Sequence, residues 1–496
     1  MRKGPGGFSP LIVIDRDCAH PLHRQIYDGF RAAIVGRSLS PGQQVPSTRV
    51  LASELGISRI PVLNAYAQLL AEGYFESRVG AGTFVSSSLP DQIAGTESRA
   101  SSPARVRVGP RRIAPTASAV PRYERIPWVH GQGAFSASQP ALDAFPVKIW
   151  ANLIARHCRN PVIGTLRYGH PLGLKQLREA IAAYLRTSRG VRCEPDQILI
   201  VSGSQQALDL ATRVLLEPGA PVWLEEPGYW LARHVLIGAG CRIVPVEVDD
   251  EGLNVASGIK KCRKARAVFV APSHQYPLGV TMSASRRFQL LHWARQAGAW
   301  IIEDDYDSEY RYNSKPVASL QGLDPSSRVV YIGTFSKVLF PSLRVGYLAV
   351  PNDLVDRFLA VRHAMDVSPA HLYQAALADF ISEGHFSRHV RRMRTLYRER
   401  RAALVESIKQ EFGSALQPIG GEAGMHLTVM LLGSGSDQEI AQRAARENLW
   451  VWPLSPAYLS KRARQGFILG FGSTPAAEMA RNVKHLSRVV NMKKSA

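Results

Sequence analysis

The chain has 496 residues, which is enough for two to four domains of roughly 100–200 residues each. A hydrophobic content of 45% and a charged content of 20% suit a globular protein with a core and argue against a disordered chain. The formal net charge of +21 attracts polyanions, of which nucleic acid is the usual one, but composition cannot separate DNA from RNA or from an anionic membrane.

The five cysteines are scattered, and none forms a C-x-x-C pair. Such a set predicts neither a disulfide framework nor a metal site, and it suits a reducing cytoplasm. The N-terminus has basic residues but no apolar run after them, so we expect no signal peptide. No stretch approaches about 18 uninterrupted apolar residues, so we expect a cytoplasmic protein without a membrane span.

Composition divides the chain into three segments. Residues 10–86 are dense in helical pattern and predict one domain. Residues 87–126 are rich in Ser, Pro, Ala and Arg without apolar periodicity, which predicts a flexible basic linker. Residues 127–493 alternate short apolar runs with amphipathic stretches. This alternation predicts an α/β domain with a mostly parallel central sheet that is covered by helices on both faces.

The first predicted helix begins after Pro21. Its apolar residues Ile26, Phe30, Ala33 and Ile34 recur on one face. The spacing therefore indicates an amphipathic helix that packs this face against a core.

Two short helices and a hairpin follow. Ser47 can cap a helix that runs through Leu55, and Ser58 can cap another that runs through about Ala71. Two helices joined at a glycine predict a helix-turn-helix, whose second helix enters the major groove of DNA. The next run, ESRVGAGTFV, predicts a β-hairpin with glycines at its tip, which would be a wing. By pattern alone, a small helical bundle without a ligand explains the segment equally well.

The order of these motifs resembles the winged helix of the GntR family: P-S-T-R, then G-x-S-R, then E-G-Y-x-E-S-R-x-G-x-G-T-F-V. The resemblance implies binding to double-stranded operator DNA. Arginines suit this role, because a guanidinium can read guanine or hold a phosphate. Many members of the family have Asn-Thr where this chain has Ile60 and Pro61, and Pro61 is tolerated in a first helical turn. The positions that approach DNA in the family correspond here to Ser47, Arg49, Ser58, Arg59, Arg78, Gly80, Gly82 and Thr83.

Much of the positive charge lies beyond this first domain. The run FSRHVRRMRTLYRERR has seven arginines between Arg388 and Arg401. A solvated helix face and an auxiliary surface for phosphates both explain these arginines.

Lys337 gives the strongest chemical signal in the third segment. It ends the motif TFSK, directly after the apolar run VVYIG. Burial disfavours the charged form of an amine and so lowers its pKa, which makes a lysine a nucleophile able to form a Schiff base. An ordinary exposed lysine is the other interpretation of this motif.

Asp304 lies at the C-terminal end of the apolar run AWII, where open α/β sheets place their ligands. Tyr306 is two residues further on, so both side chains share a face of an extended chain. A carboxylate there can pair with a protonated pyridine nitrogen, and a tyrosine beside it can donate to a phenolate oxygen. A plain acidic loop would also explain the run EDDYDSEY.

Other motifs suit a phosphate and a flat ring. The run VSGSQQALDL predicts a Gly-Ser loop that opens a helix, whose free backbone N–H groups suit a phosphate. Ser204 and Gln205 add side-chain donors. Tyr229 can stack on a flat ring, and Arg344, seven residues after Lys337, can anchor a phosphate.

Taken in order, these motifs resemble those of the fold-type I enzymes that use pyridoxal 5'-phosphate (PLP), the aspartate aminotransferase superfamily. The stretches PSHQYPLG, EDDYDSEY and GTFSKVLFPSLRVGY resemble in particular the MocR/GabR regulators, which fuse a GntR winged helix to an aminotransferase-like domain. The resemblance implies a homodimer and a PLP cofactor on the larger domain.

The resemblance also implies roles for individual residues. Lys337 would form the Schiff base with PLP. Asp304 would hold the pyridine nitrogen, Tyr306 the 3'-oxygen, and Tyr229 would stack on the ring. The phosphate would be held by Ser204, Gln205, Thr334, Ser336 and Arg344, together with Tyr168 from the second subunit.

Two positions depart from the aminotransferase pattern. Ser473 stands where aminotransferases usually carry an arginine that clamps the substrate carboxylate, and Tyr276 replaces an asparagine that commonly touches PLP. The first departure argues against ordinary transamination. We therefore expect a regulator, with at most weak residual transaminase activity, whose operator binding responds to PLP or to an amine or B6-vitamer effector. The alternative is a working aminotransferase with an appended DNA-binding domain.

Overall fold

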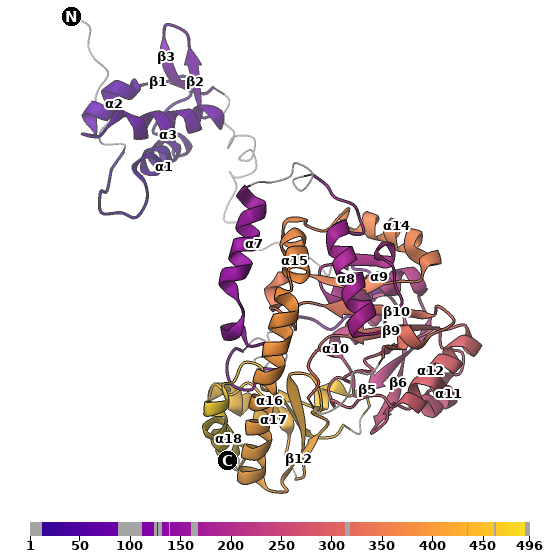
Figure 1. The fold of residues 1–496 in the computed structure, drawn as a ribbon. Helices are drawn as coiled ribbons and strands as arrows, with labels where there is room; N and C mark the ends of the chain where they lie inside the picture. Colours follow the sequence, from indigo (N-terminus) through magenta and orange to yellow (C-terminus); the bar gives the residue numbers. More distant parts are fainter. Residues whose placement is uncertain are drawn as a thin grey trace, which may run out of the picture. The chain divides into compact units, whose positions relative to one another are not determined.

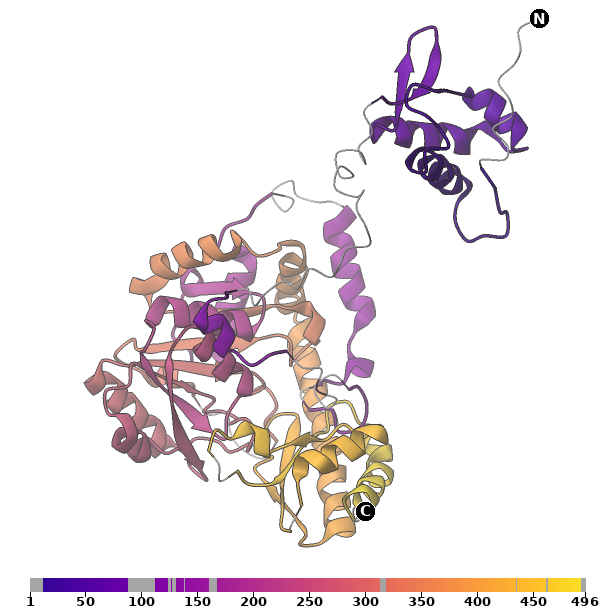
Figure 2. The same cartoon turned by 180° about the vertical axis from the view of Figure 1, so that it is seen from behind.

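The computed structural model describes residues 12–87, 112–123, 126, 131–137, 139–159, 167–312, 318–433, 435–460 and 463–491. The chain divides into two compact units, residues 1–112 and 113–496, both drawn in Figures 1 and 2. Most of the predicted linker, residues 88–111, lies outside the described residues.

The first unit is a winged helix, as the sequence predicts. Its elements are α1 (Leu22–Val35), β1 (Gln44–Val45), α2 (Thr48–Glu54), α3 (Arg59–Ala71), β2 (Phe75–Arg78) and β3 (Gly82–Val85). The three strands form one sheet in the order β1-β3-β2, and β2 and β3 are the antiparallel hairpin of the wing. The side chain of Ser47 caps α2 by accepting from the N–H of Val50, whereas that of Ser58 makes no capping hydrogen bond.

The apolar face predicted for α1 forms the core of the winged helix. Its predicted residues are all buried, and Phe30 is fully so. The rings of Phe30, Tyr66 and Phe75 meet edge to face, with centroids 5.1–5.5 Å apart. This cluster joins α1, α3 and the wing, and so it fixes the orientation of the second helix of the helix-turn-helix.

The second unit is built on an eight-stranded sheet in the order β4-β11-β10-β9-β8-β5-β6-β7. Neighbouring strands from β10 to β6 are parallel, whereas β11 is antiparallel to both of its neighbours and β7 to β6. The strands are β4 (Ile198–Val201), β5 (Pro221–Glu226), β6 (Arg242–Asp249), β7 (Gly252–Leu253), β8 (Ala267–Val270), β9 (Trp300–Asp305), β10 (Val329–Thr334) and β11 (Gly346–Ala349).

Helices cover both faces of this sheet, which explains why the strands are apolar throughout. In β4, Ile198 and Ile200 belong to one apolar cluster, and Leu199 and Val201 to the cluster on the opposite face. The covering helices are α8 (Lys175–Ser188), α9 (Ser204–Leu215), α10 (Trp230–Gly238), α11 (Val255–Cys262), α12 (Ala284–Ala297) and α14 (Val355–Asp366).

A smaller antiparallel sheet, in the order β12-β13-β15-β14, lies in the C-terminal part of this unit. The long helix α16 (His385–Phe412) runs from beside α15 into this C-terminal part and packs against α18 (Figure 1). The remaining elements are α7 (Val147–Arg159), α13 (Leu320–Leu323), α15 (Leu372–Ser382), β12 (Leu416–Ile419), β13 (His426–Leu431), α17 (Asp437–Arg446), β14 (Trp452–Pro453), β15 (Gly466–Gly470) and α18 (Ala476–Asn491).

Some arginines of α16 stabilise the fold. The sequence suggested only a solvated helix face or an auxiliary surface for phosphates, and neither includes this role. Arg400 is buried, donates to the carbonyl of Gly472 and pairs with Asp143. Arg394 donates to the carbonyl of Glu309. Part of the positive charge of α16 is therefore used inside the protein.

One part of the segment predicted as linker is helical. Residues Pro115–Ala119 form the short helix α5, which lies against α10. Pro115 at the first helical turn has no N–H to lose, which favours a helix start there. The second unit therefore begins before residue 127. No helix among the described residues is long and apolar enough to cross a membrane.

Candidate cofactor site and DNA-binding surface

Several strands of the large sheet end at one edge and place polar residues around one cavity. β5, β9 and β10 are parallel, and β4 shares their direction because it is antiparallel to β11, as β10 is. The carboxyl ends of such strands are where open sheets bind ligands. The cavity has a volume of about 200 Å³. The predicted residues that line it are Ser204, Tyr229, Asp304, Tyr306 and Lys337.

Asp304 lies between two other acids of β9, Glu303 and Asp305, and its side chain points to the opposite side of the strand from theirs. Asp305 pairs with the buried Arg189 at 2.6 Å and accepts from the hydroxyl of Tyr331. Asp304 lies in the cavity, and its Oδ1 is buried without a hydrogen-bond partner. Burial, reinforced by Asp305, raises the pKa of Asp304 to about 7. Oδ1 of Asp305 is also buried without a hydrogen-bond partner, but Asp305 does not line the cavity, so Asp304 is the one of the two that can meet a ligand there.

Lys337 follows β10, the strand beside β9, so the sheet brings its amine to the edge where Asp304 lies. Burial lowers the pKa of Lys337 to about 8, although Asp307 and Asp304 oppose this shift. A lysine with such a pKa is partly uncharged near neutral pH and can act as a nucleophile. Lys337 is half-buried and lies three residues beyond the end of β10, and its role toward PLP stays a prediction.

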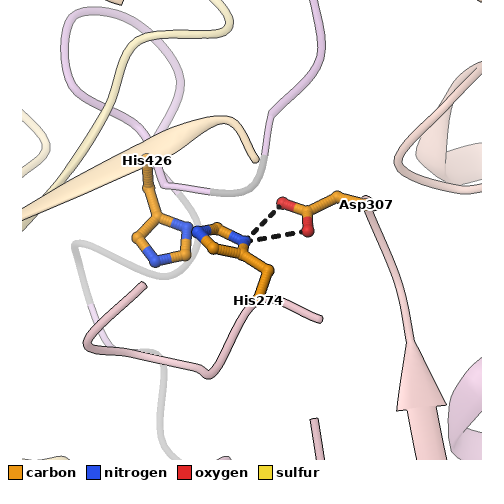
Figure 3. Close-up of side chains that lie close together, drawn as sticks. All are labelled: His274, Asp307 and His426. Atoms are coloured by element: carbon orange, nitrogen blue, oxygen red, sulfur yellow. Dashed lines mark hydrogen bonds and ion pairs between the residues drawn. The ribbon is translucent and has the colours of Figure 1, made fainter. Parts of the chain in front are cut away.

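Tyr306 is held by a histidine that the sequence analysis did not identify. Its hydroxyl lies 3.1 Å from Nδ1 of His274, and the same nitrogen lies 2.9 Å from Oδ1 of Asp307 (Figure 3). Both His274 and Asp307 are buried. Because the carboxylate can only accept, Nδ1 carries the proton. The tyrosine oxygen can then only share this one proton with the carboxylate, which leaves the hydroxyl proton of Tyr306 to donate elsewhere.

His426 lies beside this pair (Figure 3), with the two imidazole rings 4.8 Å apart. Potential metal-ligand atoms of His274, Asp307 and His426 lie within 4.8 Å of one another. Two of these atoms are already engaged, because Nδ1 of His274 binds Asp307 and Nε2 of His426 lies 3.1 Å from the carbonyl of Pro277, whereas Nε2 of His274 is buried without a hydrogen-bond partner. Burial, with a contribution from His274, lowers the pKa of His426 to about 3, so its ring is neutral. The trio is best described as a hydrogen-bonded support for Tyr306.

A glycine loop precedes α9, as predicted. Gly203 has φ +87°, and a Cβ at this position would lie 2.9 Å from Nη2 of Arg344. Arg344 itself has a left-handed φ of 50° and donates to the carbonyl of Ser202. The loop therefore places a guanidinium beside the open N–H groups at the start of α9, an arrangement that suits a phosphate.

Other residues predicted to contact the phosphate are arranged differently. The side-chain amide of Gln205 donates to the carbonyl of Leu231, so its backbone N–H is the donor left near the loop. The hydroxyl of Thr334 accepts from the N–H of Ser336, and the hydroxyl of Ser336 is buried without a partner. Their roles toward PLP stay predictions.

Two further predictions concern the rim of the site. Tyr168 is 88% exposed, so it is available to a second subunit, and its role there stays a prediction. Ser473 donates to the carbonyl of Gly133 and lines a different cavity. No arginine is among the described residues that line the cavity of Lys337; its other walls include Phe269, Tyr276 and Trp452.

The winged helix presents its predicted DNA-contacting residues to solvent. Ser47, Arg49, Ser58 and Arg59 are exposed, at or near the N-termini of α2 and α3. Nε of Arg59 donates to the hydroxyl of Thr48, which ties the two helices together. These positions suit contacts with phosphates and base edges.

The wing places its residues at the hairpin tip. Gly80 and Gly82 have φ of 76° and 109°, which favours glycine. Arg78 lies over the ring of Phe84 and pairs with Glu76 at 2.6 Å. Thr83 is half-buried in β3. The positive charge of Arg78 is therefore partly neutralised by Glu76.

Family comparisons agree with both halves of this description. Residues 22–85 match the family described as bacterial regulatory proteins, gntR family, and residues 136–468 match aminotransferase class I and II. Among solved structures, α-aminoadipate aminotransferase from Thermus thermophilus, complexed with N-(5'-phosphopyridoxyl)-L-leucine, is 27% identical with a TM-score of 0.70. It covers 76% of this chain and 97% of its own.

Full-length relatives contain both parts. The probable rhizopine catabolism regulatory protein MocR of Rhizobium meliloti is 40% identical, over 96% of this chain and 95% of its own. The HTH-type pyridoxine biosynthesis transcriptional regulator PdxR of Corynebacterium glutamicum is 32% identical, over 90% and 91%. The HTH-type transcriptional regulator TauR of Rhodobacter capsulatus is 32% identical, over 98% of each. The chain therefore belongs to the MocR/GabR-type transcriptional regulators, in which a gntR-family winged helix precedes an aminotransferase class I and II domain.

Proposed function

We propose that the chain is a homodimeric operator-binding regulator that holds PLP covalently on Lys337 and responds to PLP, another B6 vitamer or an amine. One observation carries this proposal: a buried cavity contains both an amine with a lowered pKa and a carboxylate oxygen, Oδ1 of Asp304, that has no partner. A buried carboxylate oxygen without a hydrogen-bond partner is costly, so Oδ1 of Asp304 favours a cationic or donating ligand.

The residues present fit PLP. Asp304 would accept from the pyridine nitrogen, and Tyr306, whose oxygen is held by His274, would donate its proton to the 3'-oxygen. The N–H groups at the start of α9, together with Arg344, would hold the phosphate. Tyr229 would stack on the ring. When bound, PLP supplies an aldehyde that reacts reversibly with amines and a ring that withdraws electrons.

The regulatory step would depend on two states of the large domain that differ in affinity for the ligand. A ligand shifts such an equilibrium only through its differential affinity for the two states. In a homodimer, the large domains would set the separation of two winged helices, and this separation must match the spacing of the operator half-sites. A ligand in the cavity would then change operator affinity without touching DNA.

The direct test is chemical. Full-length protein is mixed with PLP, reduced with borohydride and digested, and the mass of each lysine peptide is measured. We expect a phosphopyridoxyl group on Lys337 and none in Lys337→Ala, whereas the exposed-site control Lys175→Ala should still label at Lys337. Absence of the group from Lys337 would contradict the cofactor proposal. Gel shifts without ligand and with PLP, another B6 vitamer or a panel of amines test the regulatory part, and operator affinities that none of these ligands changes would contradict it.

Transamination is the second candidate, because the cavity is that of an aminotransferase fold. The lack of an arginine among its described lining residues weakens the candidate, since a bidentate clamp normally fixes the substrate carboxylate. We therefore expect turnover far below the typical enzyme value of about 10 per second with any amino acid and keto acid pair. Steady-state assays with a panel of pairs would show which function dominates.

A further inference from the structure

The exposed face of α3 is apolar, which is unusual for a surface helix. Ile60 is 67% exposed and Leu63 is 42% exposed. Asn64 and Ala67 are exposed on the same face, because residues three, four and seven apart align along a helix. We call Ile60, Leu63, Asn64 and Ala67 the α3 stripe. Its only polar side chain is Asn64.

The residues of the α3 stripe are not part of the buried core of the winged helix. The opposite face of α3, with Val62, Ala65, Tyr66 and Leu69, fills the core instead. Exposed aliphatic side chains gain nothing in water and favour association. The α3 stripe is therefore suited to contact with a binding partner whose surface would cover it.

The surroundings of the α3 stripe point to DNA as that surface. Arg59 precedes Ile60 directly, and Arg49 is exposed on α2, so cationic groups flank the apolar side chains. From Arg59 to Ala71 the helix carries no acidic residue, so nothing on it repels phosphate. A protein partner would not explain why the stripe begins at the first turn of the second helix of a helix-turn-helix, the turn that reaches base edges.

In the major groove, the only apolar group on a base edge is the 5-methyl of thymine. We propose that Ile60, supported by Leu63, recognises thymine methyl groups in the operator, so that part of the readout is apolar contact and not hydrogen bonding. This inference rests on the proposed operator binding and adds the base that is read. Pro61 favours this mode, because a proline in the first turn offers no N–H and no polar side chain to a base.

The experiment removes the methyl group and leaves the hydrogen-bonding edge unchanged. Full-length protein first selects binding sites from a random duplex library. In the selected duplex, each thymidine is then replaced in turn by deoxyuridine, and the Kd is measured for the wild type, Ile60→Ala and Leu63→Ala. The control is Leu70→Ala, an exposed leucine at the far end of the same helix. Thermal melts of each variant check folding.

We expect deoxyuridine at one or two positions to weaken wild-type binding about fourfold per methyl, the effect of burying one such group. The same replacement should leave the affinity of Ile60→Ala unchanged, because the contact is already lost, whereas Leu70→Ala should respond like the wild type. Ile60→Asn should shift the selected base toward adenine, which asparagine can bind bidentately.

Two results would overturn the inference while operator binding stands: no deoxyuridine effect in the wild type, or an equal effect in the wild type and Ile60→Ala. The first would mean that the α3 stripe meets something other than thymine, such as a protein. Failure to select any duplex above non-specific affinity would instead contradict the proposed function itself.

Discussion

The winged helix and the cofactor cavity use opposite physical environments for binding. Arg49 and Arg59 of the winged helix lie in solvent, whereas in the cavity Asp304 is buried and Lys337 half-buried, with pKa values moved toward neutrality. Exposed cations attract DNA over long distances and are screened by salt. Buried groups bind by direct pairing and respond to pH. Changes in salt should therefore perturb DNA binding by the winged helix, and changes in pH should perturb ligand binding in the cavity.

The largest effect should come from a substitution that destabilises the winged helix and leaves the large unit folded. Phe30 is fully buried at the centre of the aromatic cluster of the winged helix. We expect Phe30→Ala to lower the free energy of unfolding of this unit by about 3–5 kcal/mol, the usual cost of such a truncation. Hydrogen exchange in urea should show faster exchange in residues 22–85 only. Equal loss of protection in the large sheet would contradict independent units.

A second effect concerns Asp304, whose Oδ1 is buried without a hydrogen-bond partner. Asp304→Asn removes the charge that would face a ligand cation, and charge-assisted hydrogen bonds contribute about 1.5–3 kcal/mol. We expect PLP affinity, measured by absorbance titration, to fall by about 10- to 100-fold, with operator binding in the absence of PLP unchanged. Asp250→Asn, the same change at an exposed acid, is the matched control. Unaltered PLP affinity in Asp304→Asn would remove this residue from the site.

The pH dependence of the cavity gives a third test. Because the pKa of Lys337 is lowered to about 8, its amine loses its proton as pH rises through that value. Only the uncharged amine is a nucleophile, so the rate of covalent PLP attachment should rise about tenfold per pH unit below pH 8 and level off above it. Stopped-flow absorbance measures this rate. A rise that continues to about pH 10 would indicate an amine with an ordinary pKa.

Much of the fold follows from local pattern. The cap at Ser47, the glycines of the wing and the apolar runs of the large sheet each depend on neighbours within a few residues, so the sequence predicted them. The helix at Pro115–Ala119 was missed because its contacts are with α10, more than 100 residues away. Periodicity cannot reveal a five-residue helix that is stabilised by distant packing.

The same distinction applies to the cavity. Lys337 and Asp304 were predictable because each ends an apolar run, and strand ends meet at one edge of a parallel sheet. The pairs that support them were not predictable: His274 and Asp307 are 33 residues apart, and Arg189 and Asp305 are 116 residues apart. The position of His274 in PSHQYPLG, four residues after the end of β8, is the one signal that could have identified it.

The smallest effect should come from a substitution in the wing. It concerns the salt dependence of DNA binding, because salt screens exposed charges. The side chain of Arg78 is 55% exposed and already pairs with Glu76, so part of its charge is neutralised before DNA arrives. If it holds a phosphate, Arg78→Ala should weaken binding to all duplexes alike, by less than about 1 kcal/mol, and lower the slope of log Kd against log salt by at most about 1. Glu76→Gln frees the arginine and should steepen that slope. Gel shifts across a salt series measure both variants. A change in base preference in Arg78→Ala would instead mean that the wing reads a base.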